Sequence, residues 1–268
     1  MDKLLLQNRG VVIIGGTAGL GLAAARACLE AGAAVVVTGR PGKDHSAATG
    51  ALGVRGRIFE LDAQDPQAAA EVICQVVRLA GSFDALYHVA GGSGRRWGDG
   101  PLHELTDEGW EETLRLNLTS LMYSCRAAVR YWMGRRQRGS ILAMTSVLGR
   151  SPSPRYFATH AYAAAKSAVS GFIKSSAAYY APMNIRLNAI APGLVDTPMA
   201  QRAAGDDEIL RFIKTKQPLD GGRIGVAADL DAAVVYFLSD ASAFVTGQVL
   251  AIDGGWSVCE GQYTTAEE

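Results

Sequence analysis

Short apolar runs alternate along the whole chain with longer stretches that are rich in alanine and leucine. Most of the short runs are apolar on consecutive residues, which is typical of strands that are covered on both faces. The runs span residues 11–14, 34–38, 57–61, 85–89, 140–145, 186–190 and 249–252. Helices are predicted near residues 20–31, 66–80, 107–134, 161–181, 206–216 and 227–239. This alternation predicts an α/β fold, a doubly wound, Rossmann-like parallel sheet of about seven strands with helices on both faces.

No internal repeat, linker or change of composition divides the 268 residues, so we expect a single domain over residues 1–268. The least regular segments are 91–101, 147–160 and 194–225. Apolar residues are interspersed with charged ones in segment 194–225, which we interpret as an amphipathic lid over the substrate. Ordinary packing of this segment against the domain is the alternative.

Composition narrows the range of partners. Lys+Arg and Asp+Glu both number 26, so nothing indicates a nucleic-acid or membrane partner, and small molecules or copies of the chain are favoured. The four cysteines have no metal-ligand spacing, which predicts no metal site and a reducing compartment. The first ten residues contain only three consecutive leucines, too few for a signal peptide, and we expect a cytoplasmic protein.

The first predicted strand leads into the sequence GGTAGLG, in which Gly15, Thr17, Gly19, Leu20 and Gly21 open the first helix. Glycines let the backbone approach a pyrophosphate, and the helix N-terminus offers free N–H groups to it. The motif alone is weak evidence, and a merely tight turn is the alternative. Its place between a strand and a helix is what favours dinucleotide binding.

The second strand ends at Gly39, where an NAD-binding protein of this fold would carry an acidic residue for the ribose 2′-hydroxyl. Arg40 follows, and a guanidinium suits the 2′-phosphate of NADP. We therefore predict that NADP(H) is preferred, with NAD(H) possible and a solvated arginine as the alternative interpretation.

Tyr162 and Lys166 lie four residues apart in an alanine-rich helical stretch, so their side chains share one face. A tyrosine that acts as acid or base near neutral pH needs its pKa lowered by about 3 units, or about 4 kcal/mol. A neighbouring ammonium supplies part of that shift. The pair is weak evidence by itself, but Asn117 and then Ser146, at a strand end, precede it in the chain.

The glycine spacing and this residue order resemble the short-chain dehydrogenase/reductase family, which has a TGxxxGxG turn and an Asn-Ser-Tyr-Lys tetrad. The resemblance implies that Tyr162 gives a proton to the substrate carbonyl and that Ser146 bonds the same oxygen. Lys166 would hold the nicotinamide ribose and lower the phenol pKa. Asn117 would hold a water connecting Lys166 to solvent, and a buried amide bonded to nearby backbone is the alternative.

Further matches extend the resemblance over nearly the whole chain. It implies that Asp62 contacts the adenine and that Ala90 and Gly91 pack against the cofactor. Four more residues would contact the carboxamide, namely Pro192, Gly193, Val195 and Thr197. It also implies a homotetramer in which the helices near 107–134 and 161–181 pack against their symmetry mates.

The chain departs from the family pattern at three places near the predicted site. Ile14 replaces the leading threonine of the glycine turn, and His88-Val89 replaces the usual Asn-Asn. We expect His88 to be a hydrogen-bonded core histidine. The segment between Ser146 and Tyr162 is longer than usual and adds a rival tyrosine, Tyr156, which is followed four residues later by histidine rather than lysine. Tyr162 therefore stays the candidate.

Arg95, Arg96 and Trp97 could face the substrate opening and steer an anion, with a solvated loop as the alternative. The sequence as a whole predicts an NADP(H)-dependent oxidoreductase that transfers hydride between nicotinamide and a ketone or secondary alcohol, such as a carbonyl reductase or a 3-oxoacyl-type reductase. An NAD-dependent sugar or polyol dehydrogenase is the alternative. A non-catalytic nucleotide sensor is less favoured because the Tyr-Lys pair is intact.

Overall fold

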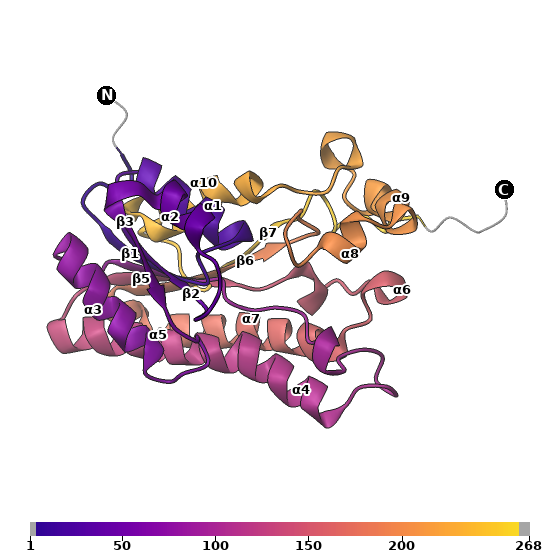
Figure 1. Cartoon of the computed structure of the whole chain (residues 1–268), viewed down its shortest axis with the longest axis horizontal. Helices are drawn as coiled ribbons and strands as arrows, with labels where there is room; N and C mark the ends of the chain where they lie inside the picture. Colours follow the sequence, from indigo (N-terminus) through magenta and orange to yellow (C-terminus); the bar gives the residue numbers. More distant parts are fainter. Residues whose placement is uncertain (1–3, 263–268) are drawn as a thin grey trace.

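The computed structural model describes residues 4–262, which form one seven-stranded parallel sheet between two layers of helices (Figure 1). The strand order is β3-β2-β1-β4-β5-β6-β7, so the chain reverses direction across the sheet between β1 and β4. In such sheets ligands bind outside the carboxyl ends of the strands at the point of reversal. The strands are β1 Gly10–Ile14, β2 Ala34–Gly39, β3 Gly56–Glu60, β4 Ala85–His88, β5 Gly139–Met144, β6 Ile185–Pro192 and β7 Val249–Ile252.

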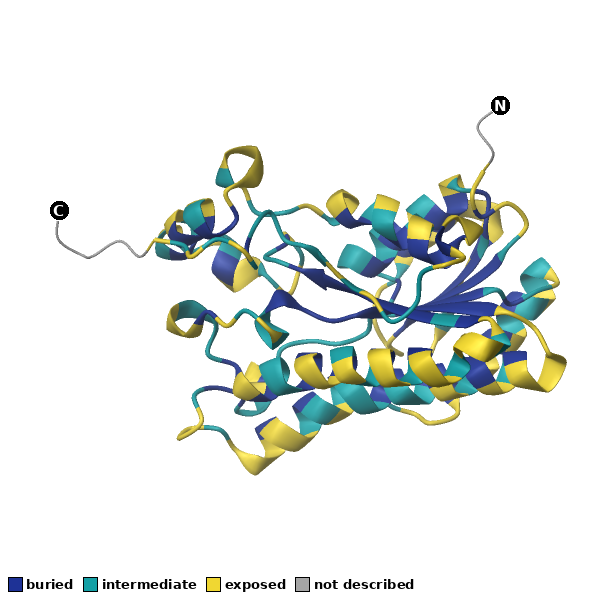
Figure 2. Ribbon diagram, turned by 180° about the vertical axis from the view of Figure 1, so that it is seen from behind, coloured by how far each residue is buried: buried dark blue, intermediate teal, exposed yellow. Residues whose placement is uncertain are grey.

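Alternate residues of each central strand face opposite helix layers, because side chains alternate along a strand. In β1, Val12 and Ile14 pack into the core shared with α3 (Ala68–Ala80), α5 (Ser120–Arg135) and α7 (His160–Tyr180). Val11 and Ile13 pack instead with α1 (Gly19–Glu30) and α10 (Asp231–Leu238). The central strands are therefore buried on both faces (Figure 2), which explains their unbroken apolar runs.

The fold class predicted from the sequence is confirmed, and so are all seven strands. The predicted helix over 107–134 consists of α4 (Asp107–Leu114), a π-helical turn over Arg115–Thr119 and then α5. Helix α9 spans Asp207–Lys216, and α10 follows a 3₁₀ turn over Ala227–Leu230. Three short helices were not predicted: α2 (Ser46–Leu52), α6 (Pro154–Phe157) and α8 (Gln201–Ala204).

None of the helices formed by residues 4–262 combines the length and the apolar character that crossing a bilayer requires. Within the same residues, no three His, Cys, Asp or Glu side chains are grouped closely enough to hold a metal ion.

Candidate active site

The glycine turn lies at the carboxyl end of β1 and packs tightly against the neighbouring segments. A Cβ atom at Gly15, whose φ is +90°, would lie 2.8 Å from the backbone of Ala90. One at Gly21 would lie 2.1 Å from the Gly15 carbonyl oxygen, so both positions exclude a side chain. The Gly15 N–H donates to Thr38 Oγ1 at 2.9 Å, so a hydroxyl from β2 contacts this turn although Ile14 replaces the family threonine.

Helix α1 begins at Gly19, and its N-cap residue Ala18 has no side chain that could bond the first N–H groups. Gly19 has a φ of +50°, and a Cβ there would lie 3.7 Å from Thr197. The helix N-terminus thus faces the segment predicted to contact the carboxamide. A bare helix N-terminus beside a glycine turn fits a pyrophosphate, and Thr17 and Leu20 lie in this same turn.

The end of β2 is occupied by a histidine that the sequence interpretation did not include. A Cβ at Gly39 would lie 2.4 Å from His45 Cε1 and 2.8 Å from Thr17 Cγ2, so a side chain at this position would have to displace the imidazole. His45 Nε2 lies 3.1 Å from the Arg40 carbonyl oxygen. Arg40 itself is exposed beside this space. Asp62 follows β3 and accepts the Gln64 N–H at 2.9 Å.

At the other end of the predicted cofactor site, Gly91 contacts two members of the tetrad. A Cβ at Gly91 would lie 2.6 Å from Asn117 Oδ1 and 3.2 Å from Lys166 Nζ. Asn117 lies in the π-helical turn, with Nδ2 donating to the Gly92 and Thr113 carbonyls at 2.9 Å and Oδ1 accepting from the Gly92 N–H at 3.1 Å. Its amide is thus bonded to nearby backbone, as in the alternative interpretation, and it fixes the loop that follows β4.

Ser146 and Tyr162 come together because β5 and the turn after it are pinned to α7. Thr145 Oγ1 donates to the Lys166 carbonyl at 2.7 Å, and the Ser167 hydroxyl donates to the Gly149 carbonyl. Lys166 Nζ donates to the Met144 carbonyl at 3.0 Å and lies 5.5 Å from the centroid of the Tyr162 ring. These contacts bring three of the four predicted catalytic residues to the end of β5.

Burial determines the ionisation of this group. It raises the pKa of the Tyr162 phenol, and a hydrogen bond with Ser146 acts in the opposite direction. Burial also lowers the pKa of Lys166 from 10.5 to about 8. The phenol is therefore protonated at neutral pH, the state that a proton donor needs. The net shift is opposite to the lowering by Lys166 that the family resemblance implies, because burial outweighs the effect of Ser146.

The segment predicted to contact the carboxamide is held by a side chain that the sequence did not reveal. Gln217, 2% exposed at the end of α9, accepts the Leu194 N–H at 2.5 Å and donates to the Leu194 carbonyl at 3.2 Å. The Gly193 N–H donates to the Ile252 carbonyl of β7 at 3.1 Å. Pro192 ends β6, Val195 is buried, and Thr197 donates to the Val195 carbonyl at 3.4 Å.

Helix α9 of the predicted lid packs its apolar side onto the extended loop 147–160. Phe212 lies 5.0 Å from the Tyr156 ring, and Phe157 lies 5.5 Å from Trp256. Glu208 Oε1 accepts from the Tyr156 hydroxyl and from Arg155 Nη2, both at 2.8 Å. The rival tyrosine is thus bonded to α9, in the segment predicted to be a lid.

His88 is the hydrogen-bonded core histidine that the sequence predicts. It is 2% exposed, with Nδ1 at 3.0 Å from the Ser124 hydroxyl and Nε2 at 3.3 Å from that of Ser120.

In the 3₁₀ turn Arg95–Trp97, the Arg96 guanidinium stacks 3.8 Å above the Trp97 ring. Both arginines of this turn are exposed.

Asp99 is a second residue that the sequence interpretation missed. Its carboxylate is 4% exposed and accepts the N–H groups of Ala161 and Tyr162 at 2.9 and 3.0 Å. No local pattern around residue 99 predicts this contact, because its partners lie more than 60 positions further along the chain.

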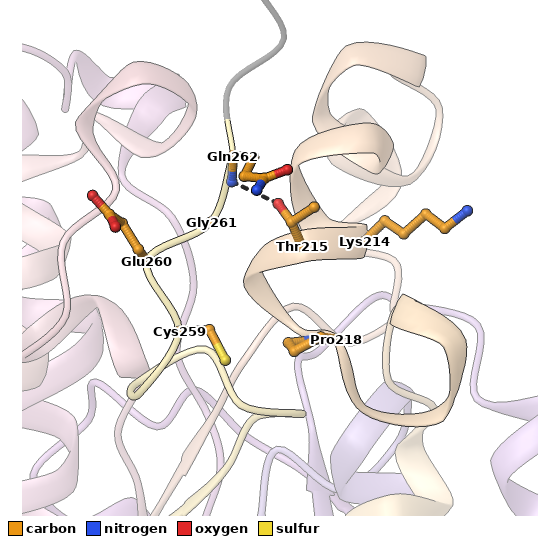
Figure 3. Close-up of a pocket in the computed structure, with 7 residues that line it drawn as sticks. All are labelled: Lys214, Thr215, Pro218, Cys259, Glu260, Gly261 and Gln262. Atoms are coloured by element: carbon orange, nitrogen blue, oxygen red, sulfur yellow. Dashed lines mark hydrogen bonds between the residues drawn. The ribbon is translucent and has the colours of Figure 1, made fainter.

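A pocket of about 390 Å³ lies between the end of α9 and the segment after β7 (Figure 3). The Gln262 N–H donates to Thr215 Oγ1 across it at 2.7 Å. Its lining residues are Lys214, Thr215, Pro218, Cys259, Glu260, Gly261 and Gln262. None of the predicted catalytic or cofactor-binding residues is among them, so this pocket is separate from the candidate site.

Comparisons with known proteins agree with this geometry. A family model described as enoyl-(acyl carrier protein) reductase matches residues 15–257. The cis-4-hydroxycyclohexanecarboxylate dehydrogenase of Sinomonas cyclohexanicum is 32% identical, over 93% of this chain and 97% of that protein. The 2-keto-3-deoxy-L-fuconate dehydrogenase of Xanthomonas campestris pv. campestris is 35% identical, over 94% of this chain and 81% of that protein.

Solved structures show the same architecture. A proposed 2-deoxy-D-gluconate 3-dehydrogenase from Agrobacterium tumefaciens with bound NADP superposes with a TM-score of 0.81 at 27% identity, covering 96% of this chain and 99% of that one. The relatives match this chain over nearly its whole length. The glycine turn, the order of the tetrad residues and the sheet topology all indicate the same family. The chain belongs to the short-chain dehydrogenase/reductase family of NAD(P)-dependent oxidoreductases.

Proposed function

We propose that this enzyme is an NADP(H)-dependent carbonyl reductase or alcohol dehydrogenase that interconverts a ketone and a secondary alcohol. The observation that carries the proposal is the attachment of the end of β5, which Ser146 follows, to α7, which carries Tyr162. Thr145 Oγ1 donates to the Lys166 carbonyl at 2.7 Å, and buried Lys166 donates through Nζ to the Met144 carbonyl at 3.0 Å. Two hydroxyl donors that meet at one point can bind a single carbonyl oxygen. They stabilise the negative charge that develops on this oxygen more strongly in the transition state than in the ground state.

The site residues have separate roles in the proposed reaction. When bound, the nicotinamide supplies or accepts the hydride. During reduction the Tyr162 hydroxyl donates its proton to the substrate oxygen while Ser146 donates a hydrogen bond to the same atom. Lys166 and Asn117 form one wall against Gly91, where the nicotinamide ribose would lie. In the oxidation direction only the Tyr162 phenolate can accept the alcohol proton, and a charged Lys166 favours that form.

Replacing Tyr162 by phenylalanine tests the catalytic assignment. Tyr162→Phe should lower kcat by at least 100-fold, because general acid catalysis contributes about 10²- to 10⁴-fold. NADPH affinity should change by less than about threefold, since the ring stays in place. Tyr236→Phe, at a partly exposed tyrosine of α10 remote from the tetrad in sequence, is the matched control. Undiminished turnover of Tyr162→Phe would reject the mechanism.

The preference for NADP(H) is supported by Gly39, His45 and Arg40. A side chain at position 39 would have to displace the His45 imidazole, and Arg40 offers an exposed guanidinium at the end of β2. The relative solved with NADP bound agrees with this proposal.

Titration of both nucleotides by fluorescence tests the cofactor preference. Arg40→Ala should weaken NADPH binding by about 10- to 100-fold, as the loss of a charge-assisted phosphate contact of about 1.5–3 kcal/mol implies, and leave NADH unchanged. Lys43→Ala, at an exposed cation three residues along, is the control. Tighter binding of NADH than NADPH to the unaltered enzyme would favour the NAD-linked alternative.

The names of the relatives suggest how to search for the substrate. Both curated relatives described above are named for carboxylate-bearing compounds. We propose to assay ketones and secondary alcohols in matched pairs with and without a carboxylate, using NADPH for reduction and NADP for oxidation. Faster turnover of the carboxylated member of each pair would assign the arginines near the opening a role in binding.

A further inference from the structure

The first turn of α7 is capped by a distant loop instead of by its own N-cap residue. A helix leaves its first N–H groups without partners, and a side chain at the N-cap normally accepts one of them. Thr159 occupies that position here, and its side chain bonds none of them. The Gly100 carbonyl accepts from His160 N–H at 3.4 Å, and the two Asp99 oxygens accept from the next two N–H groups.

The Asp99 carboxylate suits this position electrostatically. It is 4% exposed, and its charge is stabilised by these N–H groups and the positive end of the helix dipole, together with the nearby charge of Arg95. Hydrogen bonds to an ionised acceptor are shorter and stronger than those between neutral groups. The carboxylate therefore holds the backbone of Ala161 and Tyr162 firmly.

The loop that carries Asp99 is itself supported from behind by α4. Within the loop, the Asp99 N–H donates to the Gly94 carbonyl at 3.2 Å. A Cβ at Gly109 of α4 would lie 2.6 Å from the Gly98 carbonyl carbon and 2.7 Å from the Asp99 nitrogen, so the two backbones are in direct contact. α4 runs alongside the N-terminal half of α7 (Figure 1). Asp99 thus lies between two fixed elements.

The same loop reaches the cofactor side of the site. It starts at Gly91 and Gly92, which contact Asn117, and it ends where Asp99 meets α7. One continuous segment therefore joins the predicted nicotinamide contact to the helix that carries Tyr162 and Lys166.

We infer that Asp99 is a positioning residue, which holds the first turn of α7 so that the Tyr162 hydroxyl stays against Ser146. This inference rests on the proposed role of Tyr162. Without the carboxylate, the N–H groups of Ala161 and Tyr162 in the first turn of α7 would lose their acceptors. A displacement of about 1 Å at a reacting group can cost about 100-fold in rate.

Kinetics of two substitutions at this position test the inference. Asp99→Ala should lower kcat by about 100-fold, while the NADPH dissociation constant changes by less than about threefold. Asp99→Asn keeps one acceptor and should recover about tenfold of the loss. Thr106→Ala is the matched control, because Thr106 Oγ1 anchors the same loop to Trp97 and caps α4 without touching α7. The control should lose thermal stability and keep its kcat.

A double mutant distinguishes action through Tyr162 from a general effect. If Asp99 works by placing the phenol, Asp99→Ala combined with Tyr162→Phe should be as slow as Tyr162→Phe alone, within about threefold. If the two losses of kcat multiply in the double mutant, the inference is wrong. So would normal kcat in Asp99→Ala and Asp99→Asn when Tyr162→Phe is inactive. Full activity of Tyr162→Phe would instead reject the proposed function. If Asp99→Ala does not fold, the same comparisons are made with Asp99→Asn, alone and combined with Tyr162→Phe.

Discussion

The protonation of single buried residues gives this enzyme a stability that depends on pH. Burial, together with the charge of Lys166, lowers the pKa of His88 from 6.5 to about 3. Between these two values the unfolded chain binds a proton at this histidine and the folded chain does not. Stability therefore falls as the pH falls through that window, by up to about 1.4 kcal/mol per unit.

His88→Asn should remove this dependence, and an asparagine amide can bond the hydroxyls of Ser120 and Ser124. At pH 5 the histidine costs about 2 kcal/mol relative to pH 7.5, so the variant should lose less stability than the native chain over that interval. Urea unfolding at the two pH values measures the difference. His103→Asn, whose side chain is 79% exposed, is the control. Parallel pH curves for the native chain and His88→Asn would contradict the prediction.

Residues that depend on local pattern could be predicted, and those that depend on distant contacts could not. The glycine turn, Ser146 and the Tyr162–Lys166 pair each lie at a strand end or on a helix face, so spacing places them. Asp99 and Gln217 act on residues 63 and 23 positions away, and their neighbours show no periodicity that indicates a site. His45 acts on Gly39 and Arg40 nearby, but the fold of the turn after β2 is needed to bring the ring back onto Gly39. Asn117 was identified, but its bonds to backbone required the structure.

At the scale of elements, long periodic segments were predicted well and short ones were missed. The central strands are largely apolar because both faces are covered, so their pattern is strong. α6 and α8 have only four residues each, too few for a helical period to be visible. Both lie in segments that were interpreted as irregular, and they form parts of the extended loop and of the predicted lid.

The contact between these two segments predicts how the lid affects substrate binding. Glu208 on α9 holds Arg155 and Tyr156 of the extended loop. Glu208→Ala should raise the KM of the substrate by about three- to tenfold, because lids that close over a site contribute to substrate retention, and should leave kcat within about twofold. Hydrogen exchange in residues 147–160 and 207–216 should become faster.

Asp207→Ala provides the control for this prediction. Asp207 lies in the same first turn of α9 and is exposed, so its removal changes the charge of the turn without cutting the contact to the loop. An equal rise of KM in both variants would show that charge, and not the contact, is responsible.

At the scale of the molecule, the parallel topology explains why separate motifs form one site. The glycine turn, Ala90–Gly91, Ser146 and Pro192–Thr197 follow β1, β4, β5 and β6, which are neighbours in the sheet. All their carboxyl ends lie on the same edge, so residues far apart in sequence meet there. The sequence could therefore place the site from the predicted parallel sheet, whereas the strand order came from the structure.

The outer face of α7 predicts how copies of the chain assemble. Four small residues are exposed on it at positions 168, 171, 175 and 178. Large apolar side chains are exposed nearby in the same helix layer, with Trp110 and Met133 each 41% exposed and Tyr179 68%. A face of small residues lets a second helix approach closely. Together with the tetramer expected from the family resemblance, this favours pairing of α7 with its symmetry mate.

Gly171→Arg should therefore produce a smaller assembly in light scattering without unfolding the chain. Among residues 4–262, no heavy atom beyond the adjoining backbone of α7 lies within 4 Å of a Cβ built at Gly171. The folded protomer therefore has room for the side chain, whereas a helix packed on that face does not. Gly50→Arg is the control, since Gly50 is also helical, exposed and free of neighbours within 4 Å, but lies on α2 away from this face. A native chain that scatters as a monomer, or a Gly171→Arg variant that keeps the native mass, would show that α7 is not an interface.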